Sequence, residues 1–231
     1  MDNRKQEWQG IYPAMLTPLN KDETLDTESA ARLVNLLLDQ GTAGLYLGGN
    51  TGECFSIDDN VRTRLFNIAV RECGDRGKII AHVGGVPLKR AEQMAREACK
   101  SGVDAISAMV PYGGAYTTDE LFGYYRALSQ TVDVPLLAYH IPVRSGYEMD
   151  LDMLSRLLDI PNVDGLKFTG SDCFLLERLC TRFPEKLFFM GCDQMLLQGL
   201  AAGASGGIGS TYNLLSPVAV RICQAFGKGD L

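Results

Sequence analysis

The chain has 231 residues, of which 46% are hydrophobic and 22% charged, and its formal net charge is −6. This length can form one domain with a large core, so we expect a single domain over residues 1–231. The acidic balance, without a cluster of lysine and arginine, argues against nucleic-acid binding. No apolar run approaches membrane-spanning length, and the polar start MDNRKQEWQG is unlike a signal peptide.

Cysteine and histidine content narrows the expected chemistry. The seven cysteines are odd in number, scattered and free of any C-x-x-C pair. This usage is typical of small apolar side chains in a reducing compartment. The two histidines, His82 and His140, are too few for a histidine-built metal site. We therefore expect a cytoplasmic protein that binds no metal and no membrane.

Apolar strand patterns alternate with helical patterns along the chain. The expected strands span 10–19, 44–49, 78–85, 105–111, 135–142, 163–170, 186–193 and 206–213, and the expected helices span 27–40, 56–75, 88–100, 118–131, 151–158, 173–183, 194–202 and 217–226. Parallel strands need crossover helices, so the pattern predicts an α/β protein with a (β/α)8 TIM barrel. An open doubly wound sheet is the alternative, but no G-x-G-x-x-G follows the first strand.

The segment 163–170, VDGLKFTG, places a lysine within a short apolar strand. Because strand side chains alternate, Lys167 shares one face with Gly165 and Thr169, whereas Phe168 points the other way. An ammonium kept from water loses its charged form more easily, and the free amine attacks carbonyls. An ion-paired structural lysine is the commoner case, so the groups around Lys167 decide its role.

Polar residues gather where the expected strands end, which is the active-site rim of a (β/α)8 barrel. They are GGNTGE at 48–53, PYGG at 111–114, YHIP at 139–142, KFTG at 167–170, GCDQ at 191–194 and GSTYN at 209–213. If Tyr139 points inward beside Lys167, its phenol can move a proton; a packed aromatic with a satisfied hydroxyl is the alternative. His140 then faces the helices, where packing is the favoured role.

Two glycine-rich loops have the composition of anion-binding sites. Backbone N–H groups of 48–53, with the Thr51 hydroxyl, can hold a carboxylate or phosphate, and the run 205–213 admits the same interpretation. Plain turns are the alternative. An amine, a phenol and an anion site together predict Schiff-base chemistry: the lysine condenses with the ketone of a 2-oxo acid, and the imine then accepts the electrons of an adjacent C–C bond.

These segments resemble a known family, the pyruvate-dependent class I aldolases that include N-acetylneuraminate lyase and dihydrodipicolinate synthase. The resemblance implies a (β/α)8 barrel assembled as a homotetramer, with no cofactor beyond the covalent imine. It implies small-molecule ligands, a 2-oxo acid and an aldehyde. It also implies that Lys167 forms the imine, that Tyr139 shuttles the proton, and that Asn50 and Thr51 bind the pyruvate carboxylate. The matching segments are GGNTGE at 48–53, YHIPVRSG at 139–146, GLKFTG at 165–170 and GASGGIGSTYN at 203–213.

Within the family, the lyase is the closer likeness. Thr169, two residues after the lysine, and the run GIGSTYN resemble the lyase. The resemblance implies that Gly191, Asp193 and Ser210 contact the hydroxylated tail of a sialic acid. Cleavage of N-acetylneuraminate, or a similar sugar-derived 2-oxo acid, to pyruvate and N-acetylmannosamine is the expected function. The alternatives are condensation of pyruvate with aspartate semialdehyde, an aldolase for another 2-keto sugar acid, and a non-catalytic ligand-binding barrel.

The sequence departs from the family pattern at several positions. Arg144, expected to contact substrate, stands where the lyase has an aliphatic residue and the synthase an arginine that helps hold a carboxylate. Gln194, also expected in the substrate site, replaces a glutamate and so adds a hydrogen-bond donor. Gly113 falls where many members donate a tyrosine across a subunit interface, and Asn50 replaces a serine or threonine. The sequence also ends where members continue, so a C-terminal helical segment is expected to be lacking.

Overall fold

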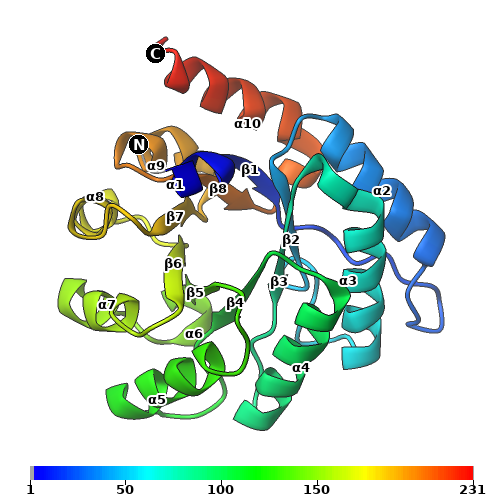
Figure 1. Cartoon of the computed structure of the whole chain (residues 1–231), viewed down its shortest axis with the longest axis horizontal. Helices are drawn as coiled ribbons and strands as arrows, with labels where there is room; N and C mark the ends of the chain where they lie inside the picture. Colours follow the sequence, from blue (N-terminus) through cyan, green and yellow to red (C-terminus); the bar gives the residue numbers. More distant parts are fainter. Residues whose placement is uncertain (1–2, 231) are drawn as a thin grey trace.

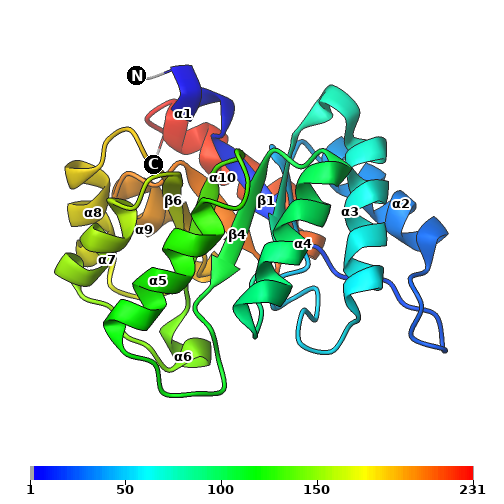
Figure 2. The same ribbon diagram turned by 60° about the horizontal axis from the view of Figure 1, so that its bottom comes forward.

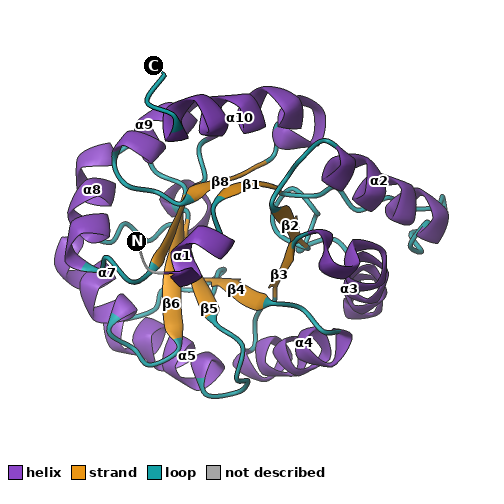
Figure 3. Cartoon of the chain, turned by 45° about the horizontal axis from the view of Figure 1, so that its top comes forward, coloured by secondary structure: helices purple, strands orange, loops and turns teal. Residues whose placement is uncertain are grey.

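The computed structural model describes residues 3–230 and contains one sheet of eight parallel strands in the order β1-β8-β7-β6-β5-β4-β3-β2. The Ala43 N–H donates to the Ile11 carbonyl and the Met15 N–H to the Tyr46 carbonyl, both at 2.9 Å, so the ends of the sheet meet in a ring (Figure 3). The predicted (β/α)8 barrel is confirmed. The strands span Gly10–Pro13 (β1), Gly44–Leu47 (β2), Lys78–His82 (β3), Ala105–Met109 (β4), Leu136–His140 (β5), Val163–Phe168 (β6), Leu187–Met190 (β7) and Gly206–Gly209 (β8).

The helices surround the ring (Figure 1). The main ones span Thr27–Asp39 (α2), Asp59–Cys73 (α3), Leu88–Ser101 (α4), Thr118–Ser129 (α5), Leu151–Leu158 (α7), Cys173–Arg182 (α8), Leu196–Ala201 (α9) and Tyr212–Gly227 (α10). Two short helices fall outside the predicted pattern, α1 (Asn3–Glu7) and α6 (Pro142–Ser145). They lie at opposite ends of the barrel (Figure 2). Short 3-10 turns occupy Gly74–Arg76 and Asp193–Met195.

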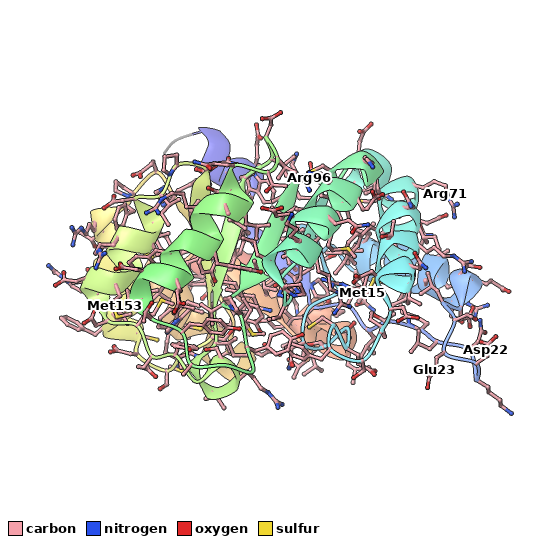
Figure 4. The ribbon with its side chains drawn as sticks, turned by 90° about the horizontal axis from the view of Figure 1, so that it is seen from below. Met15, Asp22, Glu23, Arg71, Arg96 and Met153 are labelled. Carbon is pink, nitrogen blue, oxygen red and sulfur yellow. The ribbon has the colours of Figure 1, made fainter. Side chains whose placement is uncertain are left out.

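Several predicted boundaries were wrong by a few residues. The first strand ends at Pro13 instead of residue 19, because the chain leaves the sheet and forms a loop that carries Asp22 and Glu23 away from the barrel (Figure 4). Helix α3 begins at Asp59 instead of residue 56, after a series of turns. Helix α10 spans Tyr212–Gly227, but the non-helical residue Leu215 divides it, and its second segment begins close to the predicted start at residue 217.

Aromatic side chains fill the barrel interior at the end covered by α1. The rings of Trp8 and Tyr12 stack with centroids 6.4 Å apart, and Phe189 packs edge-on against Tyr12 at 5.2 Å. All three side chains are buried. Their packing closes this end of the ring to ligands, so chemistry is confined to the opposite rim, where the strands end.

Candidate active site

The amine of Lys167 lies between two aromatic rings inside the barrel. Its Nζ is 4.0 Å from the ring centroid of Tyr46 and 4.1 Å from that of Tyr139, and the residue is only 4% exposed. Strand alternation produces this placement, because the next residue, Phe168, faces outward and stacks on His140 with centroids 5.4 Å apart. The predicted faces of this strand are therefore confirmed.

Burial changes the acid–base state of this amine. Loss of water lowers the pKa of Lys167 from 10.5 to about 7, although the nearby Asp193 and Cys54 partly offset the effect. Aromatic faces attract a cation but accept no proton from it. At neutral pH a large fraction of the amine is uncharged, which is the form that attacks a carbonyl.

Tyr139 stands directly beside this lysine. The two residues are register partners of adjacent strands β5 and β6, as alternation predicted. Burial raises the pKa of the Tyr139 phenol, and the nearby hydroxyl of Thr169 lowers it by less. The phenol is therefore protonated at neutral pH and able to donate. The Thr169 hydroxyl is itself buried near this phenol, but no well-aligned hydrogen bond joins it to a described residue, so it can still bond to a ligand.

The glycine-rich loop at 48–53 continues from the end of β2. Gly48 adopts a left-handed backbone (φ +60°), which turns the chain across the rim. Asn50 and Thr51 are half-buried. The Thr51 hydroxyl lies 2.6 Å from the hydroxyl of Ser210, which follows β8. The two predicted anion loops thus meet at one point of the rim.

Asp193 bonds to the residue that follows Ser210. Its carboxylate accepts hydrogen bonds from the Thr211 N–H at 2.6 Å and the Thr211 hydroxyl at 2.7 Å. A side chain on Gly209 would collide with it, because an added Cβ would lie 1.8 Å from the carboxylate oxygen. The absence of a side chain at Gly209 therefore leaves room for the Asp193 carboxylate. One carboxylate oxygen is bonded to Thr211, and Asp193 is half-buried.

Gly191 packs so closely against Thr169 that a side chain at position 191 should destabilise the protein. A Cβ on Gly191 would lie 2.0 Å from the Thr169 hydroxyl oxygen. We expect Gly191→Ala to lower the free energy of unfolding by about 1–3 kcal/mol, as overpacking does. Denaturant unfolding measures the loss. Part of it should be recovered in a Thr169→Ala background, and equal losses in both backgrounds would contradict this account.

Two predicted substrate contacts, Arg144 and Gln194, are exposed. Arg144 lies on α6, and its charge lowers the pKa of Tyr139, although by less than burial raises it. Gln194 is exposed within the 3-10 turn after β7. Both follow strand ends in sequence, and each stands in a short turn of helix after its strand.

Sequence reasoning missed two residues that contact the cluster, Tyr46 and His82. The Tyr46 hydroxyl donates to the Ser107 hydroxyl at 3.2 Å, which fixes the ring over Lys167. The rings of His82 and Tyr139 pack edge-on with centroids 6.1 Å apart. Tyr46 lies within β2 and His82 is the last residue of β3, so a search limited to the loops that follow the strands overlooks them. Strand alternation in GLYLGG was the available signal for Tyr46.

His140, Gly113 and Tyr112 lie on strands or loops next to the site residues. His140 faces the helical layer as predicted, and burial lowers its pKa to about 4. Gly113 is exposed with φ +82°, while Tyr112 packs on Phe55 with ring centroids 4.4 Å apart.

Within residues 3–230, no group of three histidine, cysteine or acidic side chains is arranged to hold a metal ion. No helix in that range is long and apolar enough to cross a membrane.

Comparison with known proteins gives consistent matches. An N-acetylneuraminate lyase from Enterobacter sp. (strain 638) is 37% identical over 226 residues, covering 97% of this chain and 76% of the relative. The lyase of Salmonella paratyphi A is 38% identical over 224 residues, covering 96% and 75%. The structure of CdNal from Clostridium difficile in complex with mannosamine superposes with a TM-score of 0.92 at 36% identity, covering 95% of this chain and 76% of that one. The chain thus spans about three quarters of its relatives' length.

A family model matches nearly the whole chain. The family is described as the dihydrodipicolinate synthetase family, and its model matches residues 7–231. The match includes every strand of the barrel and the lysine held inside it. The chain belongs to the dihydrodipicolinate synthetase family.

Proposed function

We propose that this protein is a Schiff-base aldolase of the N-acetylneuraminate lyase type, which cleaves N-acetylneuraminate to pyruvate and N-acetylmannosamine. One observation carries the proposal: a buried lysine amine with a pKa of about 7 lies beside a protonated tyrosine. The curated lyases at 37% and 38% identity support the choice of substrate.

In the proposed mechanism, the free amine of Lys167 attacks the C2 carbonyl of the open-chain substrate. The Tyr139 phenol donates a proton to the resulting hydroxyl, which leaves as water, and a protonated imine forms. The C3–C4 bond then breaks. Its electrons move into the imine to give an enamine, while the C4 hydroxyl returns a proton to the phenolate and becomes the aldehyde. The Tyr139 phenol then protonates the enamine carbon, and addition of water to the resulting imine releases pyruvate, restores the amine and returns the proton to the phenolate.

Other residues are proposed to hold the substrate. The N–H groups and hydroxyl of the loop around Asn50 and Thr51 receive the carboxylate, as anions are received by glycine-rich turns. Asp193, Gly191 and Ser210 line the path of the sugar hydroxyls. Thr169, whose hydroxyl makes no well-aligned hydrogen bond to a described residue, is positioned to bond the substrate or Tyr139. Since the imine itself accepts the electrons, the proposed reaction uses no added cofactor.

The substrate assignment has a direct test against the synthase reaction. The value of kcat/KM for N-acetylneuraminate cleavage is compared with that for condensation of pyruvate with aspartate semialdehyde. We expect the cleavage value to be larger. A dominant condensation activity would favour the synthase alternative, for which the family description and Arg144 are the supporting observations.

The pKa of Lys167 gives the expected pH dependence. Only the free amine attacks pyruvate, so the rate of imine formation should rise as pH increases through about 7 and level off above that value. A lysine that kept the ordinary value of 10.5 would instead give a rate that still rises about tenfold per pH unit at pH 9. Trapping the imine with borohydride at timed intervals measures this rate. A profile without a plateau would contradict the low pKa.

The assembly and location expected from the sequence stay predictions. A homotetramer and a cytoplasmic location are proposed on the resemblance to the family, with small-molecule 2-oxo acids and aldehydes as the binding partners. Light scattering on the purified chain tests the tetramer, and a mass of about 25.2 kDa would identify a monomer instead.

A further inference from the structure

A buried histidine joins the ends of three neighbouring strands beside Lys167. His82 is the last residue of β3 and is 1% exposed. The backbone N–H of Met109, at the end of β4, donates to His82 Nε2 at 3.3 Å. A backbone N–H can only donate, so Nε2 carries no proton. The neutral ring therefore has its proton on Nδ1, which lies 3.1 Å from the carbonyl oxygen of Gly48 and donates to it.

The two bonds of this ring reach the two strands that neighbour β3. Gly48 is the first residue of the loop at 48–53, which is the proposed carboxylate site. Met109 is the register partner of Tyr139. The His82 ring thus fixes the anion loop on one side and the strand next to the proton shuttle on the other.

A buried arginine supports the histidine from the helical layer. Arg62 of α3 is 1% exposed and donates to the His82 carbonyl oxygen. Its other hydrogen-bonding partner is Asp59, at 3.4 Å, which also pairs with Arg90 at 2.7 Å. Burial, and then the Arg62 charge, lower the pKa of His82 well below 6.5, so the ring keeps the neutral form that both bonds require.

We propose that His82 is a positioning residue for the reaction, which holds Gly48 so that the loop N–H groups stay aimed at the carboxylate of the 2-oxo acid. This proposal rests on the proposed function. The position of Gly48 at the start of this loop is the observation that links the histidine to substrate binding. The proposed role acts on substrate binding through Gly48 and leaves the amine of Lys167 untouched.

Two substitutions of His82 each keep one of its two ring hydrogen bonds and remove the other. The amide of His82→Asn overlies Nδ1 and keeps a donor for Gly48, whereas the amide of His82→Gln reaches the place of Nε2 and keeps only an acceptor for Met109. We expect His82→Gln to raise KM for N-acetylneuraminate about tenfold, the equivalent of one hydrogen bond, with a smaller change in kcat. His82→Asn should stay within about threefold of the wild-type KM.

A matched control removes the other histidine. His140→Asn also replaces a buried ring, but one that stacks on Phe168 in the outer layer, so it should lower the melting temperature without raising KM. Equal KM values in the wild type and both His82 variants would overturn the proposal, as would equal increases in both variants. A wild type that forms no borohydride-trapped adduct with pyruvate would instead overturn the proposed function.

A measurement on the wild type keeps the proposal testable if neither variant folds. The chain has two histidines, so ¹⁵N-labelled histidine gives two sets of ring signals. We expect a proton on Nδ1 of His82 and slower exchange of that proton once pyruvate is trapped on Lys167. A proton on Nε2, or an exchange rate unchanged by trapping, would overturn the positioning role.

Discussion

Lys167→Ala is expected to abolish turnover while the protein still folds. Without the amine no imine forms, and no other lysine lies between the rings of Tyr46 and Tyr139 in the described part of the chain. We expect kcat to fall by roughly ten-thousand-fold or more, as for other covalent nucleophiles. The fold should survive, because burial of an amine is itself unfavourable and its removal offsets part of the cavity cost.

Lys78→Ala is the matched control. Lys78 also belongs to a barrel strand, but it lies at the closed end, where it pairs with Asp104 at 3.1 Å. This variant should keep the wild-type kcat and lose at most about 1 kcal/mol of stability, because the pair is partly exposed. Turnover in Lys167→Ala equal to that of the parent would contradict the role given to Lys167.

Tyr139→Phe is expected to slow the reaction without preventing imine formation. The phenylalanine keeps the ring 4 Å from the amine but removes the phenol that donates to the leaving water and receives the C4 hydroxyl proton. General acid–base groups contribute about a hundred- to ten-thousand-fold, so we expect kcat to fall by that factor. Borohydride should still trap pyruvate on Lys167, more slowly than in the wild type.

Tyr125→Phe controls for the loss of a buried phenol. The Tyr125 hydroxyl, on α5, donates to the Ala108 carbonyl at 2.9 Å and also interacts with the backbone of Tyr139, so this variant removes a polar contact behind Tyr139 but keeps its phenol. Removal of the Tyr125 hydroxyl should cost about 1 kcal/mol of stability and leave kcat unchanged. If Tyr139→Phe and Tyr125→Phe reduced kcat equally, the loss would reflect packing, and Tyr139 would not be the proton shuttle.

The barrel and the pairing of Lys167 with Tyr139 were both predictable from the sequence. Eight alternations of strand and helix leave few topologies, and alternation within two adjacent strands fixes which side chains share the interior. The register of β5 against β6 then follows from the hydrophobic pattern, because a slip of one residue would turn Phe168 inward and Lys167 outward.

Other parts of the site depend on contacts that no local pattern encodes. Tyr46 reaches Lys167 across the ring, because β2 and β6 lie on opposite sides of the closed sheet. The His82 bonds join residues 34 and 27 positions away in the chain. The exposure of Arg144 follows from the short helix α6, whose four residues carry too weak a periodicity to predict.

Borohydride reduction in the presence of pyruvate, followed by peptide mass mapping, tests most directly that a buried lysine forms the imine. We expect one covalent adduct, on the peptide that contains Lys167, with the pH dependence of an amine whose pKa is about 7. A folded wild-type protein that acquires no adduct, or acquires it on a different lysine, would contradict the proposed chemistry.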